Sequence, residues 1–413
     1  MLKHLKKIDI FSKNIIVVFL ATTLVNVFNL LYQLLIAHKL SPEDFASFNA
    51  LISIFMLVSA PLANLQTVVA KYISEFRARQ EKRKLKVLMT QILKRTLFFS
   101  VVSFFIIYLL SPVLMRSLKI PSNLSGPILA VTIALSWITP VLLGSLQGFE
   151  LFSWLSSVSV IGGFLKLLFA AIFLYLGFSI AGAVGALMFS GLIITFILVI
   201  PLKDVLNFKT RGDGINFREI FMYLIPVGVT SFCYMGLVNS DMIMVKYYFP
   251  SFDSGVYSLA QMVGKIFLFL PAAISVVMFP KTSGLNAKSM DTTQTLKKSL
   301  IYGGILCLAA AFAYNLFPEF ILKILTGKYS PEAISLGRFF SISMSFFTLL
   351  YILEIYFLSI SDLRFLKYLI AGLFCQLIAI AVFHVNLGQV AVVLLINSIL
   401  LFLFHLKLVK FNR

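Results

Sequence analysis

Long, uninterrupted apolar runs alternate with short polar breaks along the whole chain. A membrane-spanning helix needs about 20 consecutive apolar residues, and each run is long enough to supply them. The runs do not alternate between apolar and polar positions, which favours helices over the strands of a membrane barrel. We therefore predict an all-α integral membrane protein with about twelve transmembrane helices, at residues 14–37, 45–70, 94–115, 127–149, 151–177, 179–201, 217–248, 255–279, 299–318, 333–358, 364–384 and 387–407.

The composition supports this prediction. Of the 413 residues, 60% are hydrophobic and only 12% are charged, whereas a soluble domain carries about 25% charged residues. This excludes a soluble globular protein and a disordered chain. The cysteines Cys233, Cys307 and Cys375 lie in separate apolar runs, so we expect no disulfide, no metal site and no cofactor.

The positive charges predict the orientation. The formal net charge is +19, and 26 of the 35 Lys and Arg residues fall on one side of the predicted membrane, against 7 on the other. Since cytoplasmic loops are enriched in Lys and Arg, both termini are predicted to be cytoplasmic, in the cytoplasmic (inner) membrane. Residues 71–95 carry nine of these charges, which suit a loop lying against anionic membrane lipids. No nucleic-acid partner is expected.

The two halves of the chain match each other at an offset of 208 to 210 residues. Each half holds six predicted spans, so both enter the membrane from the same side and the repeat is parallel, as in two-lobed transporters. We predict a six-helix N-terminal lobe over residues 1–208 and a six-helix C-terminal lobe over residues 209–413. The matched pairs are Asp44 with Asp253, Phe48 with Tyr257, Pro61 with Pro271, Lys71 with Lys281, and Gln33 with Asp241.

Polar residues line one face of the first predicted span. Thr22, Asn26, Asn29 and Gln33 follow helical spacing, and such a stripe is unfavourable against lipid. It either lines a hydrated cavity or makes hydrogen bonds to neighbouring helices. The repeat-equivalent stripe ends in a carboxylate, Asp241, which favours the cavity.

Four ionisable residues fall inside predicted spans: Lys166, Asp241, Lys265 and Glu354. Each costs roughly 2.5–3.5 kcal/mol at the bilayer centre unless it is paired or hydrated. One interpretation is a central cavity with a lysine from each lobe, where an ammonium attracts a phosphate. Lys265 would share its helix face with Gln261 in that cavity. The other interpretation is a set of structural ion pairs between helices, which we favour for Glu354, while Asp241 fits both equally.

Several segments resemble the polysaccharide biosynthesis (oligosaccharide flippase) family of the multidrug/oligosaccharidyl-lipid/polysaccharide exporter superfamily. They are residues 65–75, 144–149 with Phe152, 163–167, and the stretch from 239–241 through 255–258. The resemblance implies two six-helix lobes around a central cavity. It also implies a non-enzymatic flippase that moves a polyprenyl-diphosphate-linked glycan across the membrane by alternating access. A cationic lumen that contacts the diphosphate or acidic sugars would fit Lys166 and Lys265. Asn26, Asn29, Gln33 and Gln261 are the further cavity candidates.

Other functions remain open at this point. A cation-coupled drug exporter of the same superfamily commonly uses an acidic residue in its first helix, which is lacking here. Asp241 is the comparable group, and H+ or Na+ is the candidate coupling ion. A major-facilitator transporter would carry a basic Gly/Asp/Arg loop motif, which residues 71–86 lack. A membrane glycan ligase or polymerase would need a sizeable outer loop with catalytic Arg or His, and the longest predicted outer loops have only about 15 residues.

Overall fold

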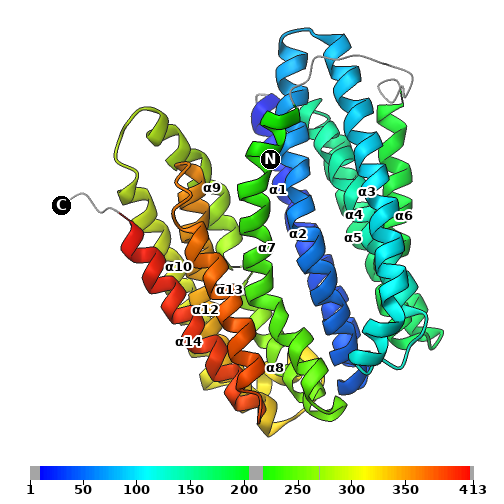
Figure 1. The fold of residues 1–413 in the computed structure, drawn as a ribbon, viewed down its shortest axis with the longest axis vertical. Coiled ribbons are helices and arrows are strands. Elements are labelled where there is room, and N and C mark those ends of the chain that lie inside the picture. The colour runs from blue at the N-terminus through cyan, green and yellow to red at the C-terminus, as the bar shows by residue number, and fades with distance from the viewer. Residues whose placement is uncertain (1–9, 204–216, 269, 410–413) are drawn as a thin grey trace, which may run out of the picture. The chain divides into compact units, whose positions relative to one another are not determined.

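The computed structural model describes residues 10–203, 217–268 and 270–409, and in these ranges the chain is built from α-helices, without a β-strand (Figure 1). The all-α architecture predicted from the apolar runs is thereby confirmed. The first helices are α1 (Ile10–Lys39), α2 (Pro42–Ala78), α3 (Lys82–Ser117), α4 (Ser125–Gly148), α5 (Phe152–Tyr175) and α6 (Ser179–Val199), followed by a short 3-10 turn, η2 (Ile200–Leu202). The remaining helices are α7 (Phe217–Tyr248), α8 (Ser251–Phe267), α9 (Leu270–Ala287), α10 (Thr293–Leu316), α11 (Pro318–Thr326), α12 (Pro331–Ser359), α13 (Leu366–Val382) and α14 (Leu387–Leu408).

Many of these helices can cross a membrane. Nine of the described helices are long and apolar enough by length and composition, and α13 is a shorter apolar helix. α2 and α3, with 37 and 36 residues, measure roughly 54 Å each at 1.5 Å per residue. Both are therefore much longer than the roughly 30 Å hydrocarbon core. The basic segment 71–95 occupies the ends of α2 and α3 that meet at their connecting turn.

The predicted eighth span, 255–279, is wrong as a single helix. The structure divides it into α8, which is capped by Leu268, and α9, in which Pro271 is the second residue. Its repeat partner Pro61 instead lies inside the continuous helix α2. α8 ends at Phe267, two residues after Lys265.

The chain forms two compact units. Unit one comprises residues 1–39 and 58–225, and unit two comprises residues 40–57 and 226–413. The first part of α2 therefore groups with unit two. The lobe boundary predicted between residues 208 and 209 lies outside the described residues.

In unit one, α5 packs against both α1 and α6, and α3 packs against α4. Gly163 lets α1 approach α5 closely, because a Cβ there would lie 3.2 Å from the ring of Phe28. A separate apolar cluster, formed mainly by α2, α3 and α4, includes Ile73, Leu88 and Leu146, which are fully buried. The α1–α5 seam carries the polar side chains of Asn29 and Lys166.

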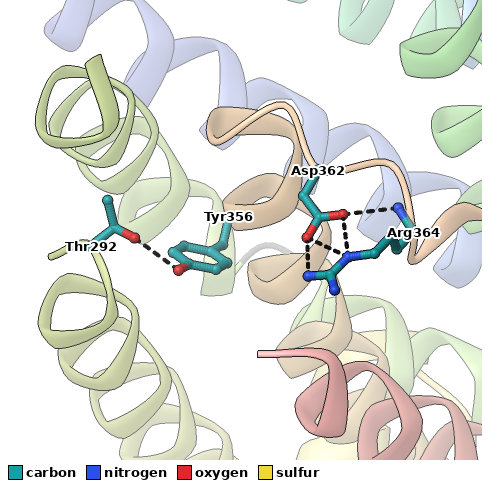
Figure 2. A network of polar contacts seen from close by, with 4 residues as sticks. All are labelled: Thr292, Tyr356, Asp362 and Arg364. Atoms are coloured by element: carbon teal, nitrogen blue, oxygen red, sulfur yellow. Dashed lines mark hydrogen bonds and ion pairs between the residues drawn. The ribbon is translucent and has the colours of Figure 1, made fainter. Parts of the chain in front are cut away.

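In unit two, α12 is the central helix and packs against α8, α9, α10 and α14 (Figure 1). Two buried hydroxyl pairs fix its C-terminal end. Thr292, at the start of α10, lies 2.9 Å from the Tyr356 hydroxyl, and Thr282 of α9 lies 2.6 Å from Ser359 (Figure 2 shows the first pair). In the turn that follows, Arg364 donates hydrogen bonds to both carboxylate oxygens of Asp362, which raises the pKa of the guanidinium (Figure 2).

Candidate functional site

Lys166 is the one ionisable side chain of unit one that the sequence placed in mid-membrane. Its ammonium donates a hydrogen bond to Asn29 Oδ1 on α1 and lies 4.7 Å from the centroid of the Tyr32 ring. The Tyr32 hydroxyl in turn donates to the Ala183 carbonyl of α6 at 2.8 Å. Since both partners of the ammonium are neutral, the lysine keeps its positive charge uncompensated by these contacts. Its side chain is only partly buried.

The residues of the polar stripe on α1 differ in their exposure. Asn29 and Gln33 are partly buried, whereas Thr22 and Asn26 are exposed. The Thr22 hydroxyl donates to the Val18 carbonyl of its own helix at 2.8 Å. Asn29 thus makes an interhelical hydrogen bond, as one interpretation of the stripe expected. The lining of a cavity by Asn26, Asn29 and Gln33 stays a prediction.

Asp241 of α7 is the centre of a buried polar cluster in unit two. Its side chain is fully buried. The Tyr257 hydroxyl donates to its Oδ2 at 2.8 Å, and Gln261 Nε2 lies 3.2 Å from Oδ2 and 3.3 Å from Oδ1. Hydrogen bonds of this kind lower the cost of burying a carboxylate. The cluster therefore presents an acidic group held by two neutral donors from α8.

Lys265 lies two helical turns beyond Tyr257 on the same face of α8. Its Nζ donates to Asn49 Oδ1 on α2 at 3.0 Å. It interacts electrostatically with Asp241, but the two form no direct ion pair among the described residues. Asn49 is buried, whereas Lys265 is partly buried. The second mid-membrane lysine is thus also held by an asparagine.

The environment of Glu354 on α12 differs from the one expected, which was an ion pair with a residue of another helix. Its side chain is 1% exposed, and neither carboxyl oxygen has a hydrogen-bond partner within the described part of the chain. Tyr234 and Tyr351, whose ring centroids are 4.9 Å apart, are close enough to interact with it electrostatically. The expected pairing with a lysine is not formed within the part of the chain that the structure describes. Glu354 is a buried acidic group surrounded by aromatic residues.

The internal repeat places a glutamine where unit one has Lys166. Gln376 of α13, 210 positions after Lys166, donates from Nε2 to the Leu237 carbonyl of α7 at 2.8 Å. Leu237 lies 208 positions after Asn29. A polar link between the repeat-equivalent helices therefore occurs in both units, from side chain to side chain in unit one and from side chain to backbone in unit two. The charged lysine occurs in the link of unit one. Lys265, on α8, is not the repeat equivalent of Lys166.

Two partners of the lysines were not among the sequence-predicted residues, namely Tyr32 and Asn49. Both are polar side chains within predicted spans, so an inventory of every polar residue in the spans would have included them. The sequence did not indicate which lysine each of them contacts, because Asn49 and Lys265, for example, are 216 positions apart.

The family model described as "Polysaccharide biosynthesis protein" matches residues 11–285, which is about two thirds of the chain. The protein therefore belongs to the polysaccharide biosynthesis protein family, as the resemblance in its sequence indicated. It is also similar to an uncharacterised membrane protein of Methanocaldococcus jannaschii, with 27% identity over 222 residues. That match covers 50% of this chain and 52% of the relative, so the chain spans about half the length of the curated relative it matches.

Solved transporter structures share the fold. An inward-facing multidrug resistance MATE family transporter of the MOP superfamily superimposes with a TM-score of 0.76 at 17% identity, covering 93% of this chain and 94% of that one. The lipid II flippase MurJ, in an inward closed conformation, superimposes with a TM-score of 0.72 at 15% identity, covering 96% and 88%. The chain thus has the two-lobed fold of about twelve transmembrane helices that these proteins share.

Proposed function

We propose that the protein is a flippase that moves a polyprenyl-diphosphate-linked glycan across the cytoplasmic membrane by alternating access. The single observation that carries the proposal is the presence of one partly buried mid-membrane lysine in each unit, Lys166 and Lys265, each with an asparagine as its polar partner. Neither ammonium is neutralised by a direct ion pair among the described residues. Such charges favour an anionic substrate, and a diphosphate is one.

In this proposal the neutral polar residues orient the lysines and contact the glycan. Asn29 holds Lys166, while Asn26 and Gln33 extend the same helix face with amides suited to sugar hydroxyls. Gln261 lies between Tyr257 and Lys265 on one face of α8 and contacts the Asp241 carboxylate of α7. Substrate phosphate would offset the cost of keeping each ammonium in the membrane.

Asp241 is the proposed coupling group, and H+ or Na+ is the coupling ion. It is a fully buried carboxylate that accepts hydrogen bonds from the neutral side chains of Tyr257 and Gln261. A change in its charge by protonation or cation binding would alter both contacts with α8. A coupling ion shifts a conformational equilibrium only by its difference in affinity for the two states.

The orientation with both termini in the cytoplasm belongs to the same proposal. A cysteine replacing Asn123, in the turn between α3 and α4, is expected to react with an impermeant maleimide from outside intact cells. A cysteine replacing Gln80, in the turn between α2 and α3, is expected to react only after permeabilisation. The reverse pattern would contradict the orientation.

A flipping assay tests the proposed activity. The full chain is reconstituted into liposomes that carry a fluorescent polyprenyl-diphosphate glycan, and the fraction of glycan accessible to an added lectin is followed with time. The proposal expects accessibility to rise faster than in protein-free liposomes. Chemically unchanged glycan lipid at the end of the assay would separate a flippase from a ligase or polymerase, which would lengthen or transfer the glycan.

A cation-coupled multidrug exporter is the second candidate, favoured specifically by Asp241 and its hydrogen-bonded cluster. The two candidates differ in the charge of their cargo. An exporter of cationic drugs would move a lipophilic cation such as ethidium in response to a sodium or proton gradient. Ethidium transport that is lost in Asp241→Asn, with no glycan-lipid flipping, would favour the exporter.

A further inference from the structure

A cavity of about 600 Å³ lies in unit one, where α3 ends and α4 begins. This is the end of α3 opposite the basic segment 71–95, and it therefore lies on the predicted outer side of the membrane. The cavity is separate from the polar links of Lys166 in the α1–α5 seam. Its lining residues are Tyr108, Leu109, Ser111, Pro112, Met115, Arg116, Lys119, Ile120, Pro121, Asn123 and Pro127.

The lining carries two positive charges, Arg116 and Lys119, and no carboxylate. Arg116 forms no ion pair with any carboxylate in the described ranges. Only 7 of the 35 Lys and Arg residues fall on the predicted outer side, and two of these 7 line this one cavity. The helix dipole places roughly half a negative charge at the C-terminal end of α3. The two full positive charges of Arg116 and Lys119 exceed it. The cavity therefore attracts anions.

The backbone closes α3 directly before Lys119. Lys119 has φ of 52°, in the left-handed region that favours glycine. Its N–H donates to the Arg116 carbonyl at 3.1 Å, and the N–H of Ile120 donates to the Met115 carbonyl at 2.9 Å. This pair of hydrogen bonds is the usual end of a helix that closes with a left-handed residue. Lysine occupies the position most often taken by glycine and gives the cavity its second charge.

The apolar part of the lining continues along α3. Leu109 is 71% exposed and Val113 is 62% exposed, and with Arg116 they follow the spacing of one helix face. Since α3 is a candidate membrane span with little of its apolar window buried inside the protein, this face contacts lipid hydrocarbon. The part of the lining that belongs to α3 extends roughly 12 Å along the helix, from Tyr108 to Arg116. A ligand with a charged head and a hydrocarbon chain matches this arrangement better than a free anion.

We propose that Arg116 and Lys119 bind the phosphate headgroup of an anionic membrane lipid at the outer face of unit one, with a hydrocarbon chain of that lipid lying along Leu109 and Val113. This site goes beyond the proposed flipping activity, because it requires neither Lys166 nor Lys265. Arginine forms the two parallel hydrogen bonds that suit a phosphate, and the lysine adds a point charge.

Lipid binding to the full-length, delipidated protein tests the site. Native mass spectrometry would measure the apparent affinity for dioleoyl phosphatidylglycerol and for dioleoyl phosphatidylcholine. We expect the double variant Arg116→Gln/Lys119→Gln to bind phosphatidylglycerol about tenfold more weakly, since it loses two charge-assisted contacts. Binding of phosphatidylcholine is expected to change less than twofold. The charge-conserving variant Arg116→Lys/Lys119→Arg is expected to retain most of the affinity.

The matched control removes two other positive charges, Lys39 and Lys323, from the predicted outer side. Lys39→Gln/Lys323→Gln is expected to bind phosphatidylglycerol like the wild type, and equal weakening in both double variants would overturn the site. Displacement of phosphatidylglycerol by equimolar inorganic phosphate would show a free-anion site and overturn the lipid assignment. Unchanged flipping in the Arg116→Gln/Lys119→Gln variant would leave the proposed function intact, so the two proposals fail separately.

Discussion

Lys265 and Asn49 are joined by a hydrogen bond of 3.0 Å within unit two, although 216 positions separate them in the chain. Asn49 belongs to the first predicted lobe by position, but residues 40–57 group with unit two. The start of α2 therefore supplies the polar partner of the lysine on α8. The orientation of this lysine depends on a helix that begins in one unit and ends in the other.

Loss of the Asn49 amide should destabilise the protein. Asn49→Ala leaves the Lys265 ammonium without its polar partner, and we expect a loss of about 1–3 kcal/mol in the free energy of unfolding. Thermal unfolding of the detergent-solubilised protein measures it. Asn315→Ala is the control, because the exposed Asn315 amide bonds only to the Ala311 carbonyl of its own helix. Equal unfolding temperatures for the two variants would contradict a structural role for the contact.

The Tyr257 hydroxyl should stabilise the buried carboxylate of Asp241. Tyr257→Phe removes the donor at 2.8 Å and keeps the ring, which packs edge-on against Phe340. We expect a cost of about 1–3 kcal/mol, since a hydrogen bond to a charged group is worth more than a neutral one. Tyr302→Phe, at a position 61% exposed, should leave the unfolding temperature unchanged. A harmless Tyr257→Phe would mean that Gln261 alone suffices.

Glu354 should behave differently from Asp241. Because neither of its carboxyl oxygens has a partner among the described residues, Glu354→Gln breaks no hydrogen bond and nearly conserves volume. We expect a change within about 1 kcal/mol in the free energy of unfolding. Asp241→Asn weakens two hydrogen bonds and should cost more when both variants are compared by the same unfolding measurement. A larger loss in Glu354→Gln would reveal a partner for that carboxylate.

Asp241 should also determine the ion dependence of transport. Asp241→Asn keeps the size of the side chain but removes the group that can bind a proton or a cation. We expect the variant to flip glycan lipid at a rate independent of pH and of sodium, in liposomes where the wild-type rate depends on one of them. Wild-type ion dependence in Asp241→Asn would leave Asp241 with a structural role only.

The sequence predicted the helical spans well because each depends on local composition and length. The eighth span was predicted as one helix, but two helices cover it, and Pro271 is the second residue of α9. Its repeat partner Pro61 lies inside the continuous helix α2, so the matching prolines did not predict matching helices. Side-chain pairing could not be predicted either. Asn29 was among the predicted site residues because it lies on a polar stripe. Asn49 was not, because it is an isolated amide and its partner Lys265 belongs to a helix far away in the sequence.

The central claim is that Lys166 and Lys265 hold the anionic part of a lipid-linked glycan. Initial flipping rates in proteoliposomes test it most directly, for Lys166→Ala, Lys265→Ala, the corresponding arginine variants, and Lys203→Ala as an exposed-lysine control. We predict at least a tenfold loss for each alanine variant, partial activity for each arginine variant and wild-type activity for the control, with equal amounts of inserted protein. Wild-type flipping by the Lys166→Ala/Lys265→Ala double variant would contradict the claim.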